Sequence, residues 1–329
     1  MNKQIEEFLF DDATEEQAYR AGGKVDKIRV GHDYFDAAIH GVKECMKESY
    51  VSREPVNCML LGEGGTGKTS IAEMFISWMK PEVIIENDME ISTVPVFYTS
   101  FKTARTLEAL TEDMLKKLGD PHPREGKVAQ KAARVLELLK RCRTLIVFID
   151  ELHDLDNITV RGSKEWYQFI KWLKEISNEC GPMICLMGTS ACKGIFKGDN
   201  EMLRRFKHEL MLRRLSPGTS EEPGLLQSFL VDMCQEIEKR TQIEGFPPVG
   251  EYLEALRIYA ATKGNLDFIA TLLKLSVIKT LLDGRKVVEI RDFAAVWEGG
   301  ALNKMSLTSF NPFLASQAQI AAVIRKKSS

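Results

Sequence analysis

The chain has 329 residues, of which 44% are apolar and 28% are charged. This balance is typical of a globular protein and excludes a wholly disordered or collagen-like chain. No apolar run approaches the ~18 residues of a transmembrane helix, and the first residues lack the apolar core of a signal peptide, so we expect a cytoplasmic protein. Seven scattered cysteines without a CxxC pair favour reduced thiols over a disulfide framework or zinc site.

The formal net charge of −2 gives no indication of nucleic-acid binding, but the charge is unevenly spread. Residues 1–18 hold six acids and one lysine, whereas residues 101–143 hold eleven basic and six acidic residues. Basic residues also exceed acids in 193–214, and 301–329 has four basic residues and no acid. Each block could be a solvated helix face. Together they favour separate surfaces for different partners.

Short apolar strands alternate with helical patterns along the first two thirds of the chain. Strands are predicted at 57–61, 94–101, 144–149, 183–187 and 210–215, with a possible hairpin partner near 83–85. Helices are predicted at 32–50, after Thr69, and at 103–118, 126–141 and 166–178. This alternation predicts an α/β fold: a parallel five-stranded sheet with helices on both faces.

After Pro217 the pattern becomes all-helical, which predicts a second, smaller lid domain with helices at 225–240, 252–262, 266–282 and 292–298. The expected domains are an acidic N-terminal arm over 1–27, the α/β core over 28–216, the helical lid over 217–300 and a basic, weakly structured tail over 301–329.

The segment from Gly62 to Thr69 matches the pattern GxxxxGK[ST]. Glycines let successive backbone N–H groups face a phosphate, and the following helix adds its N-terminal dipole. Lys68 can reach the β- and γ-phosphates, and the Thr69 hydroxyl can bind Mg²⁺. The predicted nucleotide-binding residues are Gly62, Glu63, Gly64, Gly65, Thr66, Gly67, Lys68, Thr69, Ser70 and Asp150.

A second motif ends the strand 145–149 with Asp150 and Glu151. Asp150 is predicted to hold Mg²⁺ with Thr69, and Glu151 to act as the general base on water. An acidic turn or a helix N-cap would look the same in isolation, but pairing with the phosphate loop favours an NTPase that hydrolyses its nucleotide. ATP is favoured because no Asn-Lys-x-Asp guanine motif is present.

Two further elements complete the predicted catalytic set. Thr189 follows the fourth strand and could orient the attacking water, or simply cap a helix. An arginine before the fifth strand could reach the nucleotide of a neighbouring subunit and stabilise transition-state charge. Arg205, beside Phe206, is the first choice and Arg204 the second, with ordinary surface arginines as the alternative.

The order of these motifs resembles that of the AAA+ ATPases, and more narrowly of the TnsC/TniB transposition regulators, including those of CRISPR-associated transposons. The narrower resemblance is carried by Ile149 to Leu155, Gly188-Thr189, Arg204-Arg205-Phe206, Lys263-Gly264-Asn265, Thr103 to Leu107, Leu118 to Pro121 and Asn311-Pro312-Phe313. It covers roughly residues 30–315.

The resemblance implies a slow, regulatory ATPase, using ATP and Mg²⁺, that assembles as a ring or filament of six or seven subunits per turn on duplex DNA. It also implies a link between a target-selection factor of the TniQ/TnsD type and the transposase. Head-to-tail packing is the interface type that forms such rings and filaments. By resemblance, the DNA backbone would be contacted by Lys102, Thr103 and Arg105, with Lys127 and Lys131 as weaker candidates.

One departure from the AAA+ pattern concerns the lid. Many AAA+ lids carry a sensor arginine soon after the Gly-Asn motif, but Gly264-Asn265 is followed by Asp267 and no nearby arginine. Either another residue senses the γ-phosphate or the lid couples weakly to hydrolysis. Two other functions stay open at this point: another AAA+ DNA machine such as a helicase loader, and a signalling or remodelling NTPase that acts without DNA.

Overall fold

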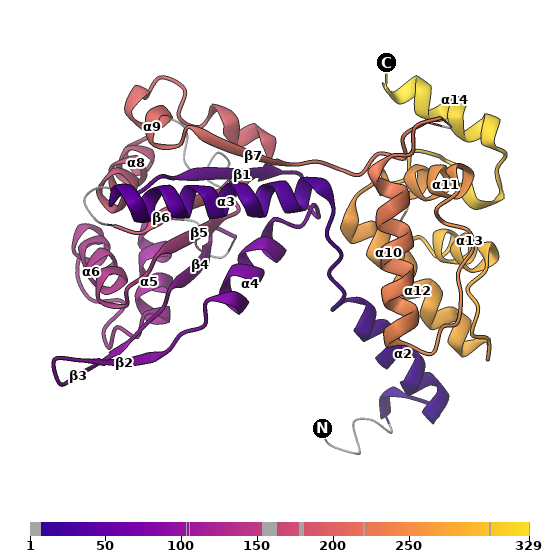
Figure 1. Ribbon diagram of the computed structural model, residues 1–329, viewed down its shortest axis with the longest axis horizontal. Helices are drawn as coiled ribbons and strands as arrows, with labels where there is room; N and C mark the ends of the chain where they lie inside the picture. Colours follow the sequence, from indigo (N-terminus) through magenta and orange to yellow (C-terminus); the bar gives the residue numbers. More distant parts are fainter. Residues whose placement is uncertain are drawn as a thin grey trace. The chain divides into compact units, whose positions relative to one another are not determined.

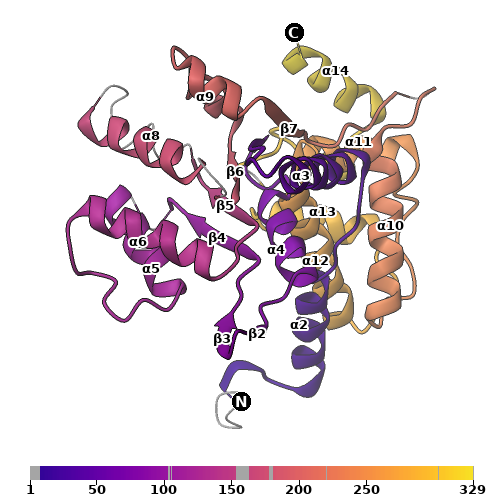
Figure 2. The ribbon, with the colours of Figure 1, turned by 60° about the vertical axis from the view of Figure 1, so that its left-hand side comes forward.

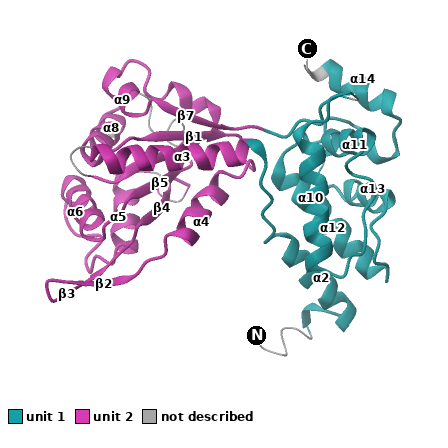
Figure 3. Cartoon of the chain, viewed as in Figure 1, with its two compact units in different colours: residues 1–33, 214–329 teal, residues 34–213 magenta. Residues whose placement is uncertain are grey.

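In a computed structural model of the chain we describe residues 8–102, 104, 106–152, 163–177, 181–219, 221–302 and 304–328. The chain divides into two compact units (Figure 3). One comprises residues 34–213, and the other joins residues 1–33 to residues 214–329. The N-terminal segment therefore belongs to the same unit as the predicted lid, although the core separates them in sequence.

The first unit contains a five-stranded sheet in the order β4-β5-β6-β1-β7 (Figure 1). Its strands are β1 (Cys58–Gly62), β4 (Val96–Ser100), β5 (Ile146–Asp150), β6 (Met183–Gly188) and β7 (His208–Leu212). All neighbours pair in parallel, as predicted from the apolar runs. The connection that leaves β1 runs over one face of the sheet to the edge strand β4, whereas the connection that leaves the neighbouring β6 runs over the other face to β7. The carboxyl ends of two such adjacent strands are the usual place for a ligand crevice.

Helices cover both faces of this sheet (Figure 2). Side chains alternate along β1, so that Leu60 faces one helical layer and Leu61 the other. One layer contains α3 (Asp33–Ser52) and α4 (Lys68–Trp78). The other contains α5 (Leu107–Lys117), α6 (Val128–Arg141), α8 (Lys164–Ile176), the 3₁₀ helix η1 (Ser190–Gly194) and α9 (Asn200–Arg205). The α/β fold with two covered faces is confirmed.

A separate hairpin extends from this unit. Strands β2 (Val83–Glu86) and β3 (Met89–Ser92) pair antiparallel around Asn87 and Asp88, which both adopt positive φ. The segment near residues 83–85 thus pairs with β3 and not with the core strand β4. Its side chains are largely exposed.

The second unit is helical, as its 3.6-residue periodicity predicted. It contains α2 (Ala13–Val25), α10 (Leu225–Arg240), α11 (Tyr252–Thr262), α12 (Leu266–Leu282), α13 (Ile290–Glu298), η2 (Pro312–Leu314) and α14 (Gln317–Ser328). Among the described residues, no helix combines the length and apolar character needed to cross a membrane.

The N-terminal segment differs from the arm expected over residues 1–27. Helix α2 packs closely on α12: a Cβ added at Gly22 would lie 2.5 Å from Cδ1 of Ile278. Lys274 also donates to the Asp26 carboxylate at 2.5 Å. Glu15 and Glu16 lie partly exposed in the first turn of α2, while Ala18 and Val25 are buried. Net charge therefore concealed an amphipathic helix.

The C-terminal segment also differs from the weakly structured tail expected over 301–329. Phe313 is buried and its ring centroid lies 5.5 Å from that of Phe293 on α13. Ile320 of α14 is buried in a cluster with Leu256 and Ala260 of α11. A few apolar residues thus fix this polar, basic segment to the helical unit.

Candidate nucleotide-binding site

The phosphate loop leaves the buried strand β1 and enters α4 at Lys68. Gly65 and Gly67 have φ values of 74° and 94°, a backbone region that favours glycine. Gly62 is restricted for another reason, because a Cβ there would lie 2.7 Å from the backbone oxygen of Leu212. The Thr66 hydroxyl donates to the Glu63 carbonyl at 2.8 Å and closes the loop on itself. Gly62, Gly65 and Gly67 thus have direct geometric causes, whereas a Cβ at Gly64 would meet nothing within 4 Å.

Lys68 lies inside the loop that contains it. Its Nζ donates to the carbonyl oxygens of Gly62 at 2.8 Å and Glu63 at 3.0 Å. Burial lowers the pKa of Lys68, while the carboxylates of Asp150 and Glu151 act in the opposite direction. An ammonium group held at the loop's centre in this way is placed to bind a phosphate oxygen.

Asp150 is the residue on which the site's hydrogen bonds converge. Its side chain is 2% exposed. Oδ1 accepts from the backbone N–H of Glu151 at 2.7 Å. Oδ2 accepts from the Thr69 hydroxyl at 3.0 Å and from the Tyr98 hydroxyl at 2.9 Å. The structure therefore brings together the two residues that were predicted to share Mg²⁺.

Sequence reasoning missed Tyr98. It lies on β4, whose pairing with β5 sets Tyr98 beside Phe148 and Ser100 beside Asp150. A hydroxyl group two residues before the carboxyl end of a core strand was the available signal. Its relevance depended on knowing that β4 and β5 are neighbours, which no local pattern shows.

Glu151 and Thr189 lie at the carboxyl ends of neighbouring strands. Glu151 follows β5 with a φ of 57°, an uncommon value for a residue other than glycine. Thr189 is half-buried, follows β6 and precedes the 3₁₀ helix η1. Because β6 lies between β5 and β1, Thr189 follows the strand that separates β5, which carries the Asp-Glu motif, from β1, which leads into the phosphate loop. This is the position expected for a residue that orients water.

The two arginines of α9 differ in their surroundings. The Arg205 guanidinium pairs with Glu201 at 2.9 Å and donates to the carbonyl oxygen of Ser177 at 3.1 Å. Arg204 is exposed in a shallow surface hollow with Asn200, Leu203 and Lys207, and no described residue pairs with its guanidinium. Arg204 thus has the accessibility that a contact with another subunit requires, and Arg205 is held within its own subunit.

The predicted DNA-contact residues also separate into groups. Lys102 and Lys127 are exposed, whereas Thr103 and Arg105 lie outside the described residues. Lys131 is buried: its Nζ is 2.8 Å from a Glu108 oxygen and 2.5 Å from a Glu112 oxygen. Hydrogen bonds to these two carboxylates raise the pKa of Lys131. The ammonium group therefore keeps its charge, and the two glutamates balance it. Lys131 therefore lacks the exposed charge that a phosphate contact needs.

The Gly264-Asn265 motif has a local structural cause. Gly264 has a φ of 68°, and a Cβ there would lie 1.9 Å from the Leu215 backbone oxygen. Asn265 caps α12 by accepting from the backbone N–H groups of Asp267 and Phe268. The motif thus fixes the start of α12 within the helical unit.

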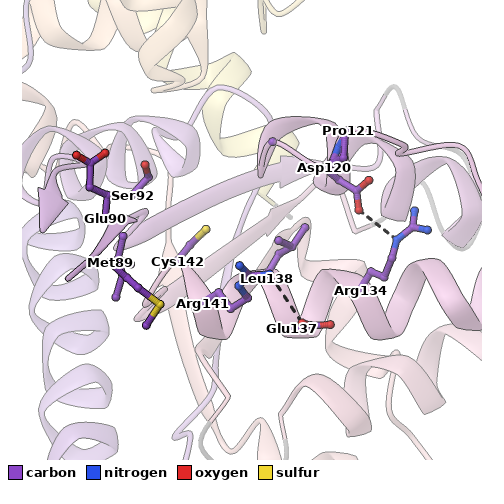
Figure 4. A pocket seen from close by; sticks show the side chains of 12 residues that line it. Met89, Glu90, Ser92, Asp120, Pro121, Arg134, Glu137, Leu138, Arg141 and Cys142 are labelled. Atoms are coloured by element: carbon purple, nitrogen blue, oxygen red, sulfur yellow. Dashed lines mark ion pairs between the residues drawn. The ribbon is translucent and has the colours of Figure 1, made fainter. Parts of the chain in front are cut away.

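A hollow of about 630 Å³ elsewhere in the first unit is distinct from this site (Figure 4). Ser92 and Cys142 line it, and they precede β4 and β5, so it lies toward the amino ends of these strands. Four of the charged groups that line it form two pairs: Arg134 with Asp120 at 3.1 Å, and Arg141 with Glu137 at 3.9 Å. The phosphate loop and Asp150 lie at the opposite, carboxyl ends.

The parallel sheet, the phosphate loop and the paired Thr69 and Asp150 define a P-loop nucleotide-binding protein with the AAA+ fold. Residues 26–215, more than half of the chain, match the family described as bacterial TniB protein. The chain belongs to this family. No curated protein matches it.

Similar solved structures include proteins from Aeropyrum pernix and Pyrobaculum aerophilum. The Aeropyrum pernix ORC2 protein in ADPNP–ADP complexes has a TM-score of 0.59 at 15% identity, over 83% of this chain and 69% of that chain. The Aeropyrum pernix ORC1 protein in complex with DNA has a TM-score of 0.57 at 17% identity, over 82% and 66%. Cdc6p from Pyrobaculum aerophilum has a TM-score of 0.57 at 14% identity, over 88% and 83%. At these identities the likeness shows the fold.

Proposed function

We propose that this protein is an ATP-dependent transposition regulator that assembles on duplex DNA. The observation that carries the ATPase part is the meeting of Thr69 and Asp150 beneath a complete phosphate loop. Membership of the TniB family supports the transposition part. The protein would hydrolyse ATP slowly, and its ATP-bound, assembled state would be the signal that regulates transposition.

The donor set of the site fits Mg²⁺ and ATP. Mg²⁺ prefers oxygen ligands and is commonly held by one or two protein oxygens together with phosphates. Thr69 and Asp150 would hold it, and Mg²⁺ would neutralise charge on the phosphates. Lys68 would bind a phosphate oxygen in place of the two carbonyls that it now contacts. Glu151 would accept the proton of the attacking water, and Thr189 would orient that water.

Assembly would complete the site in trans. The exposure of Arg204 supports a role in which it stabilises charge on the nucleotide of the next subunit. We therefore reverse the order of preference given by sequence alone, placing Arg204 before Arg205. Such a contact joins different surfaces of successive subunits, the interface type that builds rings and filaments. The family resemblance implies six or seven subunits per turn.

The DNA surface would be formed by basic residues after β4. Lys102 and Lys127 have the required exposure, and Thr103 and Arg105 remain proposed contacts. Contacts of this kind bind the phosphate backbone without reading sequence. On DNA the filament would connect a TniQ/TnsD-type target-selection factor to the transposase in the bacterial nucleoid.

The test is electron microscopy and DNA binding by the purified protein, with duplex DNA of unrelated sequences and a non-hydrolysable ATP analogue at low salt. We expect rings or helical filaments around the duplex, formed equally on each sequence and lost as salt increases. Absence of DNA binding under these conditions would refute the proposal. ATP-driven assembly that is the same with and without DNA would instead support a DNA-independent switch.

A further inference from the structure

Tyr98 lies beside Asp150 and Thr69, the two proposed Mg²⁺ ligands, although neither sequence motif includes it. Its hydroxyl lies 2.9 Å from Oδ2 of Asp150, the oxygen that also accepts from Thr69. The ring is half-buried and packs against the core formed with α3 and α4. An ionised carboxylate can only accept hydrogen bonds, so the Tyr98 hydroxyl is the donor in this contact.

The hydrogen bonds of Asp150 show why a second donor on Oδ2 matters. Oδ1 is fixed by the backbone N–H of Glu151 at 2.7 Å. Oδ2 is held by two hydroxyl groups, and one of them, on Thr69, is itself an expected Mg²⁺ ligand. When the Thr69 oxygen turns to the metal, the Tyr98 hydroxyl is the side-chain donor that stays on Oδ2 among the described residues.

We propose that Tyr98 is a positioning residue for the Mg²⁺ site: its hydroxyl holds the Asp150 carboxylate in the orientation that MgATP requires. This inference rests on the proposed ATP and Mg²⁺ binding. Hydrogen-bond partners behind a metal ligand fix its orientation, and removing one typically weakens metal binding by about 10–100-fold. Asp150 is the residue before Glu151, so the Tyr98 hydrogen bond also restrains the backbone that leads to the proposed general base.

The test compares Tyr98→Phe with the wild type in the binding of a fluorescent ATP analogue. Phenylalanine keeps the ring that packs in the core and removes only the hydroxyl group. The matched control is Tyr167→Phe, since Tyr167 on α8 is 66% exposed. Affinity for the analogue is measured in EDTA, and then at increasing Mg²⁺ to find the concentration that gives half of the metal-dependent gain.

We expect equal affinities in EDTA for all three proteins. The half-maximal Mg²⁺ concentration should increase about 10-fold or more in Tyr98→Phe alone. An unchanged or lower concentration would overturn the inference, the latter because Tyr98 would then compete with the metal. An equal loss of affinity in EDTA would also overturn it, because Tyr98 would then support the loop and not the metal site.

Failure of the proposed function gives a different result in the same experiment. A wild-type protein that binds the analogue without any gain from Mg²⁺ would refute the Mg²⁺ site and this inference with it. A wild-type protein with a clear gain, beside an unaltered Tyr98→Phe variant, would refute the role of Tyr98 alone.

Discussion

The Thr69 hydroxyl lies 3.0 Å from Oδ2 of Asp150 although the two residues are 81 positions apart. Thr69 lies in the first turn of α4, which follows β1, and Asp150 ends β5, two strands away in the sheet. Their meeting joins the phosphate loop to the Asp-Glu motif before any ligand is bound. The sheet therefore organises this part of the site, because it sets the carboxyl ends of β1 and β5 at the same edge.

Lys68→Ala should abolish ATP-dependent assembly. The ammonium group is placed for charge-assisted hydrogen bonds to phosphate, worth about 1.5–3 kcal/mol each, so we expect ATP affinity to fall by at least ~10–100-fold. Calorimetry and sedimentation would measure binding and assembly. Lys80→Ala, at an exposed position after α4, is the control. Unchanged oligomerisation of Lys68→Ala would contradict the role of the loop.

Glu151→Gln should retain ATP binding and block turnover. Glutamine keeps the shape of the side chain but cannot accept the proton of water, and general-base catalysis typically contributes about 10²–10⁴-fold. The variant should therefore accumulate in the assembled, ATP-bound state, as measured by phosphate release and electron microscopy. Glu175→Gln, on the exposed side of α8, should behave as the wild type. Normal turnover in Glu151→Gln would remove this residue as the base.

Arg204→Ala should bind ATP but lose about 10³–10⁵-fold in hydrolysis, the range found for arginines that act between subunits. Mixing it with Glu151→Gln should restore activity, because the second variant supplies Arg204 to intact sites of the first. Arg205→Ala should instead destabilise its own subunit, by on the order of 1 kcal/mol in the free energy of unfolding, through loss of the Glu201 pair. Loss of hydrolysis in a fully stable Arg205→Ala, with Arg204→Ala active, would restore the original order.

Lys102→Ala and Lys127→Ala should each weaken DNA binding uniformly across sequences. Each lost phosphate contact should reduce the slope of log affinity against log salt by ~0.9. Lys131→Met is the contrast: it should lower the unfolding temperature by leaving Glu108 and Glu112 without their partner, and leave the salt slope unaltered. A reduced slope for Lys131→Met would show that the ion pairs open on DNA.

Gly264→Ala and Gly284→Ala separate two causes of glycine preference in the helical unit. Both positions have positive φ, near 69°, but a Cβ at Gly284 meets nothing within 4 Å. We expect Gly284→Ala to cost about 1–2 kcal/mol of unfolding free energy from backbone strain. Gly264→Ala should cost more, because its Cβ would collide with the Leu215 carbonyl. Equal denaturant midpoints would refute the importance of that contact.

The sequence by itself determined the α/β fold, the helical second unit and the two phosphate-site motifs. These features depend on periodicity and on spacing within a few residues, which are local properties of the chain. Helices α10, α11, α12 and α13 lie close to the predicted ranges for that reason. Gly62 to Thr69 needed no tertiary information, since the loop's hydrogen bonds form within the loop.

Only the tertiary structure decided which side chains meet and which are accessible. It placed Tyr98 on Asp150, buried Lys131 between two glutamates, fixed Arg205 to its own subunit and left Arg204 exposed. It also packed α2, which follows the acidic first residues, on α12, where composition alone had indicated an arm. The physical reason is common to all of these: partners distant in sequence set the burial and pairing of a charged or polar group, and neither net charge nor periodicity records those partners.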